Sequence, residues 1–540
     1  MQRAFLTVDG RQLHCRVAGD GAPVVLLHPS PLSSSAVLPV ATEIARHFRV
    51  YALDTPGYGL SDPPPRQPAS LQDYLPTFAA ALDALGLGRI CLYGAATGAQ
   101  FAVEFARRYP ERCAHVVLDS AGHIDPAECD RIVPAYFPDV TPRADGGHLA
   151  TYWQMVRDLF VFFPWPDARA ARRIPRDLPP PAAMQSMLLD YLRAGEGYAW
   201  AYRPAFYNEN AARAQGVTVP ATLVRWEGSV VLRITDELIA AGLPPNFAVL
   251  HAGPAPERRT RGIAAWLRER YQGPPAPPLP AQSLPQGRFA SRYLALRGAQ
   301  LHLRQRGGDG LPRVAIAAPT GAARLVEPRL AAGSGPALVL EPPGSGESDP
   351  LPPADGPATL EGHAAVLGEA LDELGLGECE LEGHDGGAGI AIELALQRPR
   401  QVRRLRLAGE PLPDAATRAA LLEHEPRDFP PRGDGAHLLE AWHLLRDRRL
   451  WTRAGRGLRA GILPGDPALD PRELQRELVE LMCLGPRYRA ARAAELTHAH
   501  ETRLTRLACP VVLDDSPGRA AGLASAAGES PGAGHPAPRA

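Results

Sequence analysis

Short apolar runs alternate with longer amphipathic segments through both halves of the chain. In the first half these runs occupy residues 22–28, 49–54, 89–94 and 115–120. Runs this short, separated by helix-length segments, are typical of parallel strands whose two faces are both covered by helices. The pattern predicts an α/β fold with a mostly parallel, doubly wound sheet.

A helical stretch rich in tryptophan and arginine interrupts this alternation late in each half, over about residues 140–215 and 430–500. Each stretch is followed by one more apolar run, VPATLVRW in the first half and CPVVLDD in the second. A helical insertion that comes before the last strands of a parallel sheet predicts a helical cap over the sheet.

The two halves repeat one another in order. The matched segments are 8–14 with 296–302, 54–62 with 341–349, 82–88 with 371–377, and 145–158 with 434–447. Repeats at one nearly constant offset are typical of a duplicated unit. The sequence therefore predicts tandem domains over residues 1–272 and 288–516, a proline-rich linker over 273–287, and an Ala/Gly/Pro-rich tail over 517–540.

Three motifs sit in this order in the first copy, namely HPSP at 28–31, DTPGYGLSD at 54–62, and the strand-turn-helix GAATGA at 94–99. Together with the repeated strand pattern, they resemble the α/β-hydrolase superfamily with a helical cap. The resemblance covers most of residues 1–272 and 289–516. It implies two tandem α/β-hydrolase domains, whose nucleophile lies on a sharp GxSxG turn between a strand and a helix.

In the first copy this turn reads Gly94-Ala95-Ala96-Thr97-Gly98, which places Ala96 at the nucleophile position. A methyl group cannot attack a substrate. Pro254 takes the usual place of the family's histidine, and His251 could replace that histidine only if the backbone were shifted. We therefore expect the first domain to be inactive.

In the second copy the turn reads Gly383-His384-Asp385-Gly386-Gly387, so an aspartate takes the nucleophile position. This resembles the Asp-nucleophile branch of the superfamily, the dehalogenases and epoxide hydrolases, in which the carboxylate forms an ester that water then cleaves. Asp385 could equally be a solvated turn residue or a helix cap. The remaining catalytic candidates are a histidine in the tail and supporting acids after the last two strands: His535, Asp514, Asp515 and Glu410.

Candidate substrate contacts come from three places. His384 precedes the predicted nucleophile, and Thr320 and Gly321 lie in the loop that corresponds to HPSP. Trp442 and Arg446 belong to a cap pattern that also occurs in the first copy as Trp153 and Arg157. Packing of the cap is the alternative role for that pattern. Gly386 and Gly389 stand where dehalogenases carry halide-binding or carboxylate-binding side chains, which leaves the substrate open.

The amino-acid composition excludes some classes of chemistry and of binding partner. All 58 basic residues are arginine, which excludes lysine Schiff-base chemistry, and the formal net charge of −1 does not suggest a nucleic-acid partner. Seven scattered cysteines and the lack of a long apolar run predict a cytoplasmic protein without a membrane segment, a metal or a cofactor. A homo-oligomer is left open.

Two functions follow. The first is a hydrolase for a small organic substrate that acts through Asp385. The second is a catalytically dead pair of hydrolase-like domains that binds a small molecule or a protein. The distance between Asp385 and an imidazole distinguishes them.

Overall fold

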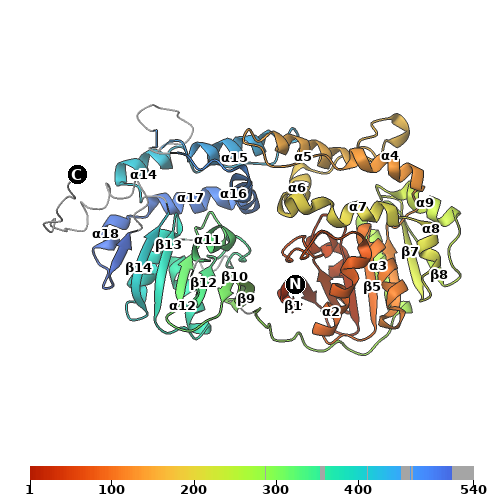
Figure 1. The fold of residues 1–540 in the computed structure, drawn as a ribbon, viewed down its shortest axis with the longest axis horizontal. Coiled ribbons are helices and arrows are strands. Elements are labelled where there is room, and N and C mark those ends of the chain that lie inside the picture. Colours follow the sequence, from red (N-terminus) through yellow and green to blue (C-terminus); the bar gives the residue numbers. More distant parts are fainter. Residues whose placement is uncertain are drawn as a thin grey trace, which may run out of the picture.

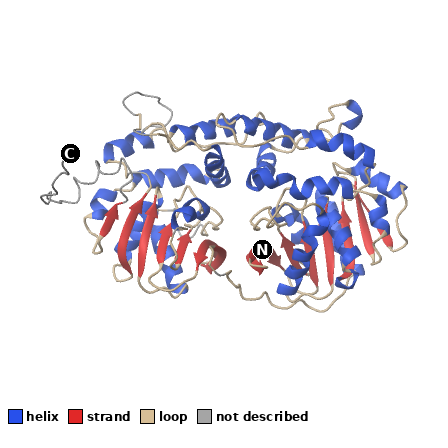
Figure 2. Ribbon diagram, viewed as in Figure 1, coloured by secondary structure: helices blue, strands red, loops and turns tan. Residues whose placement is uncertain are grey.

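The fold is taken from a computed structural model of the 540-residue chain. It describes all residues except 286, 332, 353–358, 410–411, 452–461, 464–465 and 514–540. Two separate β-sheets, each flanked by helices, make up the described part of the chain (Figure 1; Figure 2). The predicted two-domain α/β fold is therefore confirmed.

The first sheet has eight strands in the order β1-β2-β4-β3-β5-β6-β7-β8. Strand β2 runs antiparallel to β1 and β4, and the others run parallel. Its strands are β1 (Gln2–Val8), β2 (Arg11–Ala18), β3 (Pro23–Leu27), β4 (Arg49–Leu53), β5 (Ile90–Ala95), β6 (Cys113–Asp119), β7 (Ala221–Trp226) and β8 (Phe247–Ala252).

Helices of the first half fall into two groups. Five connect or cover strands: α1 (Leu38–Ile44), α2 (Leu75–Ala84), α3 (Thr97–Arg108), α9 (Leu232–Ala240) and α10 (Pro256–Arg270). The other five lie between β6 and β7 and form what we call the first insert: α4 (Pro126–Tyr136), α5 (Gly147–Asp158), α6 (Pro181–Ala194), α7 (Ala199–Asn208) and α8 (Ala211–Gln215).

Over the described residues, the second sheet has the order β9-β10-β12-β11-β13-β14-β15, which repeats the order of the first seven strands of the first sheet. Its strands are β9 (Ala290–Leu296), β10 (Ala299–Arg306), β11 (Arg313–Ile316), β12 (Ala337–Leu340), β13 (Cys379–His384), β14 (Val402–Ala408) and β15 (Val511–Leu513). Its helices are α11 (Ala323–Leu330), α12 (Leu360–Glu373) and α13 (Gly387–Gln397). The second insert, between β14 and β15, contains α14 (Ala415–Leu422), α15 (Ala436–Asp447), α16 (Pro471–Leu484), α17 (Arg487–Thr497) and α18 (His500–Leu504).

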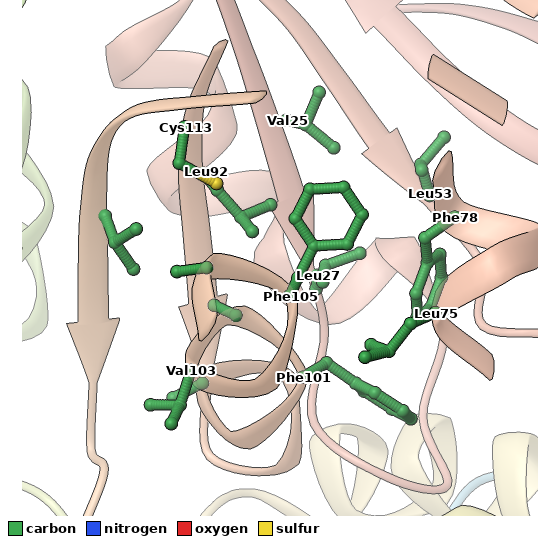
Figure 3. Packing of buried hydrophobic residues seen from close by; sticks show 14 of the residues in the cluster. Val25, Leu27, Leu53, Leu75, Phe78, Leu92, Phe101, Val103, Phe105 and Cys113 are labelled. Atoms are coloured by element: carbon green, nitrogen blue, oxygen red, sulfur yellow. The ribbon is translucent and has the colours of Figure 1, made fainter. Parts of the chain in front are cut away.

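Each sheet is stabilised by an apolar core between its strands and its helices. In the first domain, α3 is buried along almost its whole length, and Phe101 and Phe105 on it pack against Leu27, Leu92 and Phe78 (Figure 3). The rings of Phe78 and Phe101 meet edge to face at 5.2 Å. A helix buried on all sides fits its place between the sheet and the first insert.

The two sheets differ on one face. In the first domain, Cys91 and Tyr93 of β5 pack under Ile263 and Leu267 of α10. The matching positions of β13 are Glu380 and Glu382, which pair with Arg404 and Arg313 at 3.3 and 2.7 Å. Up to Leu513 this second face carries charge where the first carries apolar side chains.

The two inserts pack against each other in a reciprocal way. Trp153 of α5 stacks edge-on against His437, and Trp442 of α15 does the same with His148, with ring centroids 5.3 and 5.1 Å apart. The indole of Trp153 donates to the Gly433 carbonyl at 3.0 Å, and that of Trp442 donates to the Ala144 carbonyl at 3.3 Å. Burial lowers the pKa of both histidines to about 4, so they are neutral at pH 7.

The first two strands of each sheet repeat this reciprocity. The side chain of Gln12 bonds both backbone groups of Ser291, at 2.8 and 2.6 Å, and the side chain of Gln300 bonds those of Arg3, at 2.7 and 2.9 Å. The rings of Phe5 and Tyr293 stack between these pairs at 5.4 Å. The two domains thus meet as the subunits of an isologous dimer do, with the same patch on both sides.

We predict that Trp442→Ala destabilises the protein by roughly 3 to 5 kcal/mol, because it removes a fully buried indole and leaves a cavity between the inserts. Denaturant unfolding followed by circular dichroism measures the loss. Tyr207→Ala, at a side chain that is 49% exposed, is the control and should change stability by less than about 0.5 kcal/mol. Equal effects of the two variants would contradict a stabilising role for the insert contact.

Candidate functional site

The first elbow keeps the geometry of a nucleophile turn without a nucleophile. Ala96 lies between β5 and α3 with φ 48° and ψ −115°, a conformation that costs an L-residue about 1 to 3 kcal/mol. A Cβ on Gly94 would lie 2.1 Å from the Gly98 carbonyl, and one on Gly98 would lie 2.2 Å from that of Leu27. The turn therefore needs both glycines, yet it presents only a methyl group.

The other catalytic positions of the first domain are also lost. His251 is an exposed residue of β8, paired with Arg225 of β7 in the strand register. His28 is buried, and its ring bonds the Pro29 carbonyl and the Thr55 N–H at 2.8 and 2.9 Å, so it stabilises the loop after β3. This arrangement fits the expectation of an inactive first domain.

Aromatic rings form a cluster within the first insert. Tyr136 packs edge-to-face on Phe206 and on Tyr202, with centroids 4.6 and 5.6 Å apart, and its hydroxyl bonds that of Tyr202 at 2.9 Å. Tyr191 and Tyr198 extend the cluster, with centroids 5.9 Å apart. In the internal repeat, Tyr136 and Tyr202 match Glu425 and Arg492 of the second domain.

In the second domain Asp385 occupies the elbow between β13 and α13, with φ 50°. The next two residues, Gly386 and Gly387, are again glycines. A side chain does not fit at Gly387, because a Cβ there would lie 2.4 Å from the Ile316 carbonyl. Arg329 of α11 points a guanidinium nitrogen at an Asp385 carboxylate oxygen, 3.4 Å away. The Asp385 side chain is 38% exposed, so the pair is open to solvent.

Asp385 lies on the wall of a cavity of about 250 Å³ between the second sheet and the second insert. Its lining is part apolar and part charged: Leu360, Asp385, Gly386, Gly389, Leu412, Pro413, Thr417, Leu421, Glu425, Arg448, Trp451, Leu463, Arg492, Glu495, Leu496, His498 and His500. A cavity of this size fits a small organic molecule.

Glu495 of α17 reaches from the insert into the turn beside Asp385. Its Oε1 accepts the hydroxyl of Thr320 at 2.8 Å and the Thr320 N–H at 3.3 Å. A Cβ on Gly386 would lie only 2.4 Å from the same oxygen. The family's oxyanion hole is formed by the N–H after the nucleophile and an N–H from the loop after the third strand. The Thr320 N–H belongs to that loop, so a carboxylate oxygen of the protein itself already occupies one of these two donors.

A chain of charges continues from Glu495 along the cavity. Arg492 donates to Glu495 at 2.7 Å and to Glu425 at 2.5 and 2.8 Å, and Arg448 donates to Glu425 at 3.0 Å. Burial alone raises the pKa of Glu425, but the two guanidinium groups outweigh it and hold that pKa below its usual value. The four groups sum to zero charge.

Two histidines line this cavity. His498 donates from Nε2 to a carboxylate oxygen of Glu393, 2.9 Å away, and its Nδ1 faces Gly389, where a Cβ would lie at 3.2 Å. Gly389 is one helical turn beyond Asp385. His500 contacts Arg418 at 3.2 Å, and burial lowers its pKa to about 4. His498 is thus held by a carboxylate in the way that orients a general base.

The same carboxylate belongs to the one group of potential metal ligands found among the described residues, Glu361, Glu393 and His498, whose ligand atoms lie within 4.8 Å of one another. Arg503 donates to Glu393 at 3.0 Å and to Glu361 at 3.1 Å. Its guanidinium supplies the positive charge that a metal ion would bring, so this group does not fit a metal site.

Several residues predicted to contact substrate lie elsewhere. His384 is buried beneath the elbow, 2.8 Å from Glu382 and 3.0 Å from Arg329, because alternation along β13 turns it to the face opposite the cavity. Trp442 is fully buried between the two inserts, and Arg446 lies in the last turn of the same helix. Packing of the inserts, the alternative role, is the one that fits Trp442.

Thr320 is at the cavity, bonded to Glu495, and Gly321 follows it with its N–H bonded to the Ala318 carbonyl. The other predicted catalytic residues, His535, Asp514, Asp515 and Glu410, lie outside the described residues, as does the tail over 517–540.

Sequence reasoning missed Glu495, Arg492 and His498, the polar groups of α17 and its end. A comparison of matched positions in the two halves could have found these residues. Counting from the matched turn glycines Gly195 and Gly485, the first copy has Tyr202, Ala205 and Asn208 at these positions. Ionisable groups that replace residues without a charge, on a helix facing the nucleophile turn, indicate a polar site.

Residues 22–151 match the sequence profile of the family described as alpha/beta hydrolase fold. This stretch holds β3 to β6 and the first elbow, and the second sheet repeats the same strand order. The match supports an α/β-hydrolase fold for this chain.

The curated relatives match only part of the chain. An uncharacterised protein of Mycobacterium tuberculosis is 32% identical over 120 residues, which is 22% of this chain and 35% of that protein. The 2-hydroxy-6-oxo-2,4-heptadienoate hydrolase of Pseudomonas putida is 34% identical over 120 residues, 22% of this chain and 44% of that enzyme. The haloalkane dehalogenase of Agrobacterium fabrum is 35% identical over 109 residues, which is 20% of this chain and 36% of that enzyme. The chain thus spans less than half the length of each.

Among solved structures, epoxide hydrolase A of Mycobacterium thermoresistibile superposes on 50% of this chain and 99% of its own, at 19% identity and a TM-score of 0.41. The family and the named relatives support a hydrolase-type function. In the part of the chain that the structure describes, no helix combines the length and the apolar character needed to cross a bilayer.

The first domain provides a test of its buried charge. Glu209, which holds the loop after β6 by accepting the Gly122 N–H at 2.7 Å, is fully buried, and this burial raises its pKa to about 8. A raised acid pKa gives stability that is complete below the unfolded value near 4.5 and is lost as the pH rises through 8.

We therefore expect Glu209→Gln to gain stability relative to the wild type between pH 5 and about 8, by up to roughly 1.4 kcal/mol per pH unit. Urea unfolding at several pH values measures the difference. Glu227→Gln, at an exposed position, should show no such trend. A wild-type curve parallel to that of Glu209→Gln would contradict the raised pKa.

Proposed function

We propose that the second domain hydrolyses a small organic molecule through nucleophilic attack by Asp385. The observation that carries this proposal is the position of Asp385, on the strained elbow and on the wall of a 250 Å³ cavity. The matching residue of the first domain is Ala96, so the second domain alone offers a nucleophile at an elbow. A carboxylate is ionised at neutral pH and needs no base for its own attack.

In the first step an Asp385 oxygen bonds to an electrophilic carbon, and the leaving group departs with the bonding electron pair. Water then attacks the carbonyl carbon of the resulting ester. We assign the proton transfer of this second step to His498, which takes a proton from the water and returns it to the departing alkoxide. Glu393, 2.9 Å from the other ring nitrogen, orients the imidazole.

The relatives provide a first substrate panel. A dehalogenase and a hydrolase are among them, so short haloalkanes, epoxides and esters are suitable probes. The first two classes present the saturated electrophilic carbon that a carboxylate attacks.

The proposal predicts that Asp385→Ala abolishes turnover, because the nucleophile is removed. The fold tolerates an alanine here, since Ala96 has almost the same φ in the first domain. His498→Gln should instead stop the reaction after the first step, so that the Asp385 peptide gains the mass of the bound alkyl group. Halide release and peptide mass spectrometry measure the two effects.

Asp372→Asn and His424→Gln are matched controls in the same domain, outside the cavity lining, and should keep wild-type turnover. Turnover by Asp385→Ala at the wild-type rate would exclude the nucleophilic role. Turnover by His498→Gln without ester accumulation would exclude His498 as the base.

A second candidate function is ligand binding without chemistry. The observation that favours it is the carboxylate of Glu495 at the oxyanion position, because ester hydrolysis builds up negative charge there. This candidate predicts that no probe labels Asp385 in the wild type or in His498→Gln, while Asp385→Ala binds ligand as the wild type does.

A further inference from the structure

Arg329, in the last turn of α11, lies beside the carboxylate of the proposed nucleophile. Its Nη1 is 3.4 Å from Oδ2 of Asp385 and 3.0 Å from Nδ1 of His384. A Cβ on Gly409 would lie 2.0 Å from the other Asp385 oxygen and 2.9 Å from the same Arg329 nitrogen. The guanidinium and the carboxylate therefore meet over the backbone of Gly409, at the carboxyl end of β14.

The first domain has an apolar side chain at the matching position. The N–H groups of Ser34 and Ala323 each bond the acid that follows the next strand, at 2.6 and 2.7 Å, so these two residues correspond. Six residues further along each copy stand Val40, which is part of the buried core, and Arg329. The copy whose elbow presents a methyl group thus has a valine here, and the copy whose elbow presents a carboxylate has an arginine.

The second step of the proposed reaction needs a group that stabilises negative charge. When water attacks the ester, the electron pair of the C=O bond moves onto the carbonyl oxygen, which becomes an oxyanion. The Thr320 N–H, from the loop after β11, already bonds Glu495 at 3.3 Å, and the Thr320 hydroxyl bonds the same oxygen at 2.8 Å. Arg492 holds the other Glu495 oxygen at 2.7 Å, and that side chain is only 3% exposed. The stabilising group therefore has to come from another part of the fold.

We propose that Arg329 stabilises this oxyanion. The Asp385 oxygen beside Arg329 remains the carbonyl oxygen of the ester, and the other oxygen forms the bond to the substrate carbon. During the attack of water, the carbonyl oxygen takes the electron pair and becomes negative next to the guanidinium. Its collapse returns the pair and expels the alkoxide, which takes a proton from His498. The inference rests on the proposed function and adds a catalytic residue to it.

The neighbours of Arg329 suit this role. Arginine stays protonated throughout the reaction, and it can only donate to Nδ1 of His384. The proton of that ring therefore lies on Nε2, which faces a carboxylate oxygen of Glu382 2.8 Å away. The Arg329 and Asp385 side chains are 46% and 38% exposed. Solvent screens such a pair, so its effect should be smaller than that of a buried oxyanion donor.

Arg329→Met, which removes the charge and keeps much of the length, tests the proposal in single-turnover reactions of the full-length protein with n-butyl bromide. Bromide release measures the first step, and the mass of the Asp385 peptide measures cleavage of the ester. Arg329→Met should slow ester cleavage by at least about tenfold, so that the ester accumulates, and should not slow bromide release. Arg329→Lys, which keeps the charge, should cleave the ester at a rate between those of Arg329→Met and the wild type.

Arg403→Met is the matched control, because Arg403 of β14 is 62% exposed and pairs with Glu378 at 3.1 Å outside the cavity. It should cleave the ester as the wild type does. Guanidinium chloride at millimolar concentration should restore part of the ester cleavage in Arg329→Ala, whereas sodium chloride should not. A role of Arg329 in folding alone would not produce this rescue.

Cleavage of the ester by Arg329→Met at the wild-type rate would overturn the inference. Equal slowing of bromide release and ester cleavage would also overturn it, because that result indicates a displaced Asp385. Labelling of Asp385 in His498→Gln, combined with unchanged cleavage in Arg329→Met, would reject only the role of Arg329. Absence of labelling in every variant, His498→Gln included, would reject the proposed function and this inference with it.

Discussion

The elbow between strand and helix is the constraint on which both sites depend. Backbone carbonyls lie so close to the flanking glycines that no side chain fits there, and the central residue is forced to a positive φ. Ala96 adopts this conformation although it has no group that can react. The turn is therefore held by packing, and its strain by itself is not a sign of catalysis. What distinguishes the domains is the side chain that the turn presents and the space above it.

That space is set by the inserts. In the first insert, the rings of Tyr136, Tyr202 and Phe206 pack on one another, whereas in the second a row of paired charges lines a cavity. These charges are paired with one another, which allows arginine and glutamate to line the cavity. The same fold thus supports an aromatic cluster in one insert and a polar pocket in the other.

Much of the fold could be predicted from the sequence, because short apolar strands and their spacing are local signals. Asp385 could also be predicted from the sequence, because a turn motif fixes its position. Glu495 and His498 were not, because they lie more than 100 residues from the elbow and meet it only through the packing of the second insert. Trp442 shows the opposite case: its motif was visible, but only the arrangement of the two inserts shows that it contacts the other half of the chain rather than a ligand.

The reciprocal contact between the halves has a further consequence. Each of the two matching patches can bind only one partner. Here Trp153 and Trp442 hold the two patches together within a single chain. The two partners are covalently tethered, so their local concentration does not depend on how much protein is present. Dilution, which separates a dimer of two chains, therefore has no effect on this contact, and the two halves can carry different residues on either side of it.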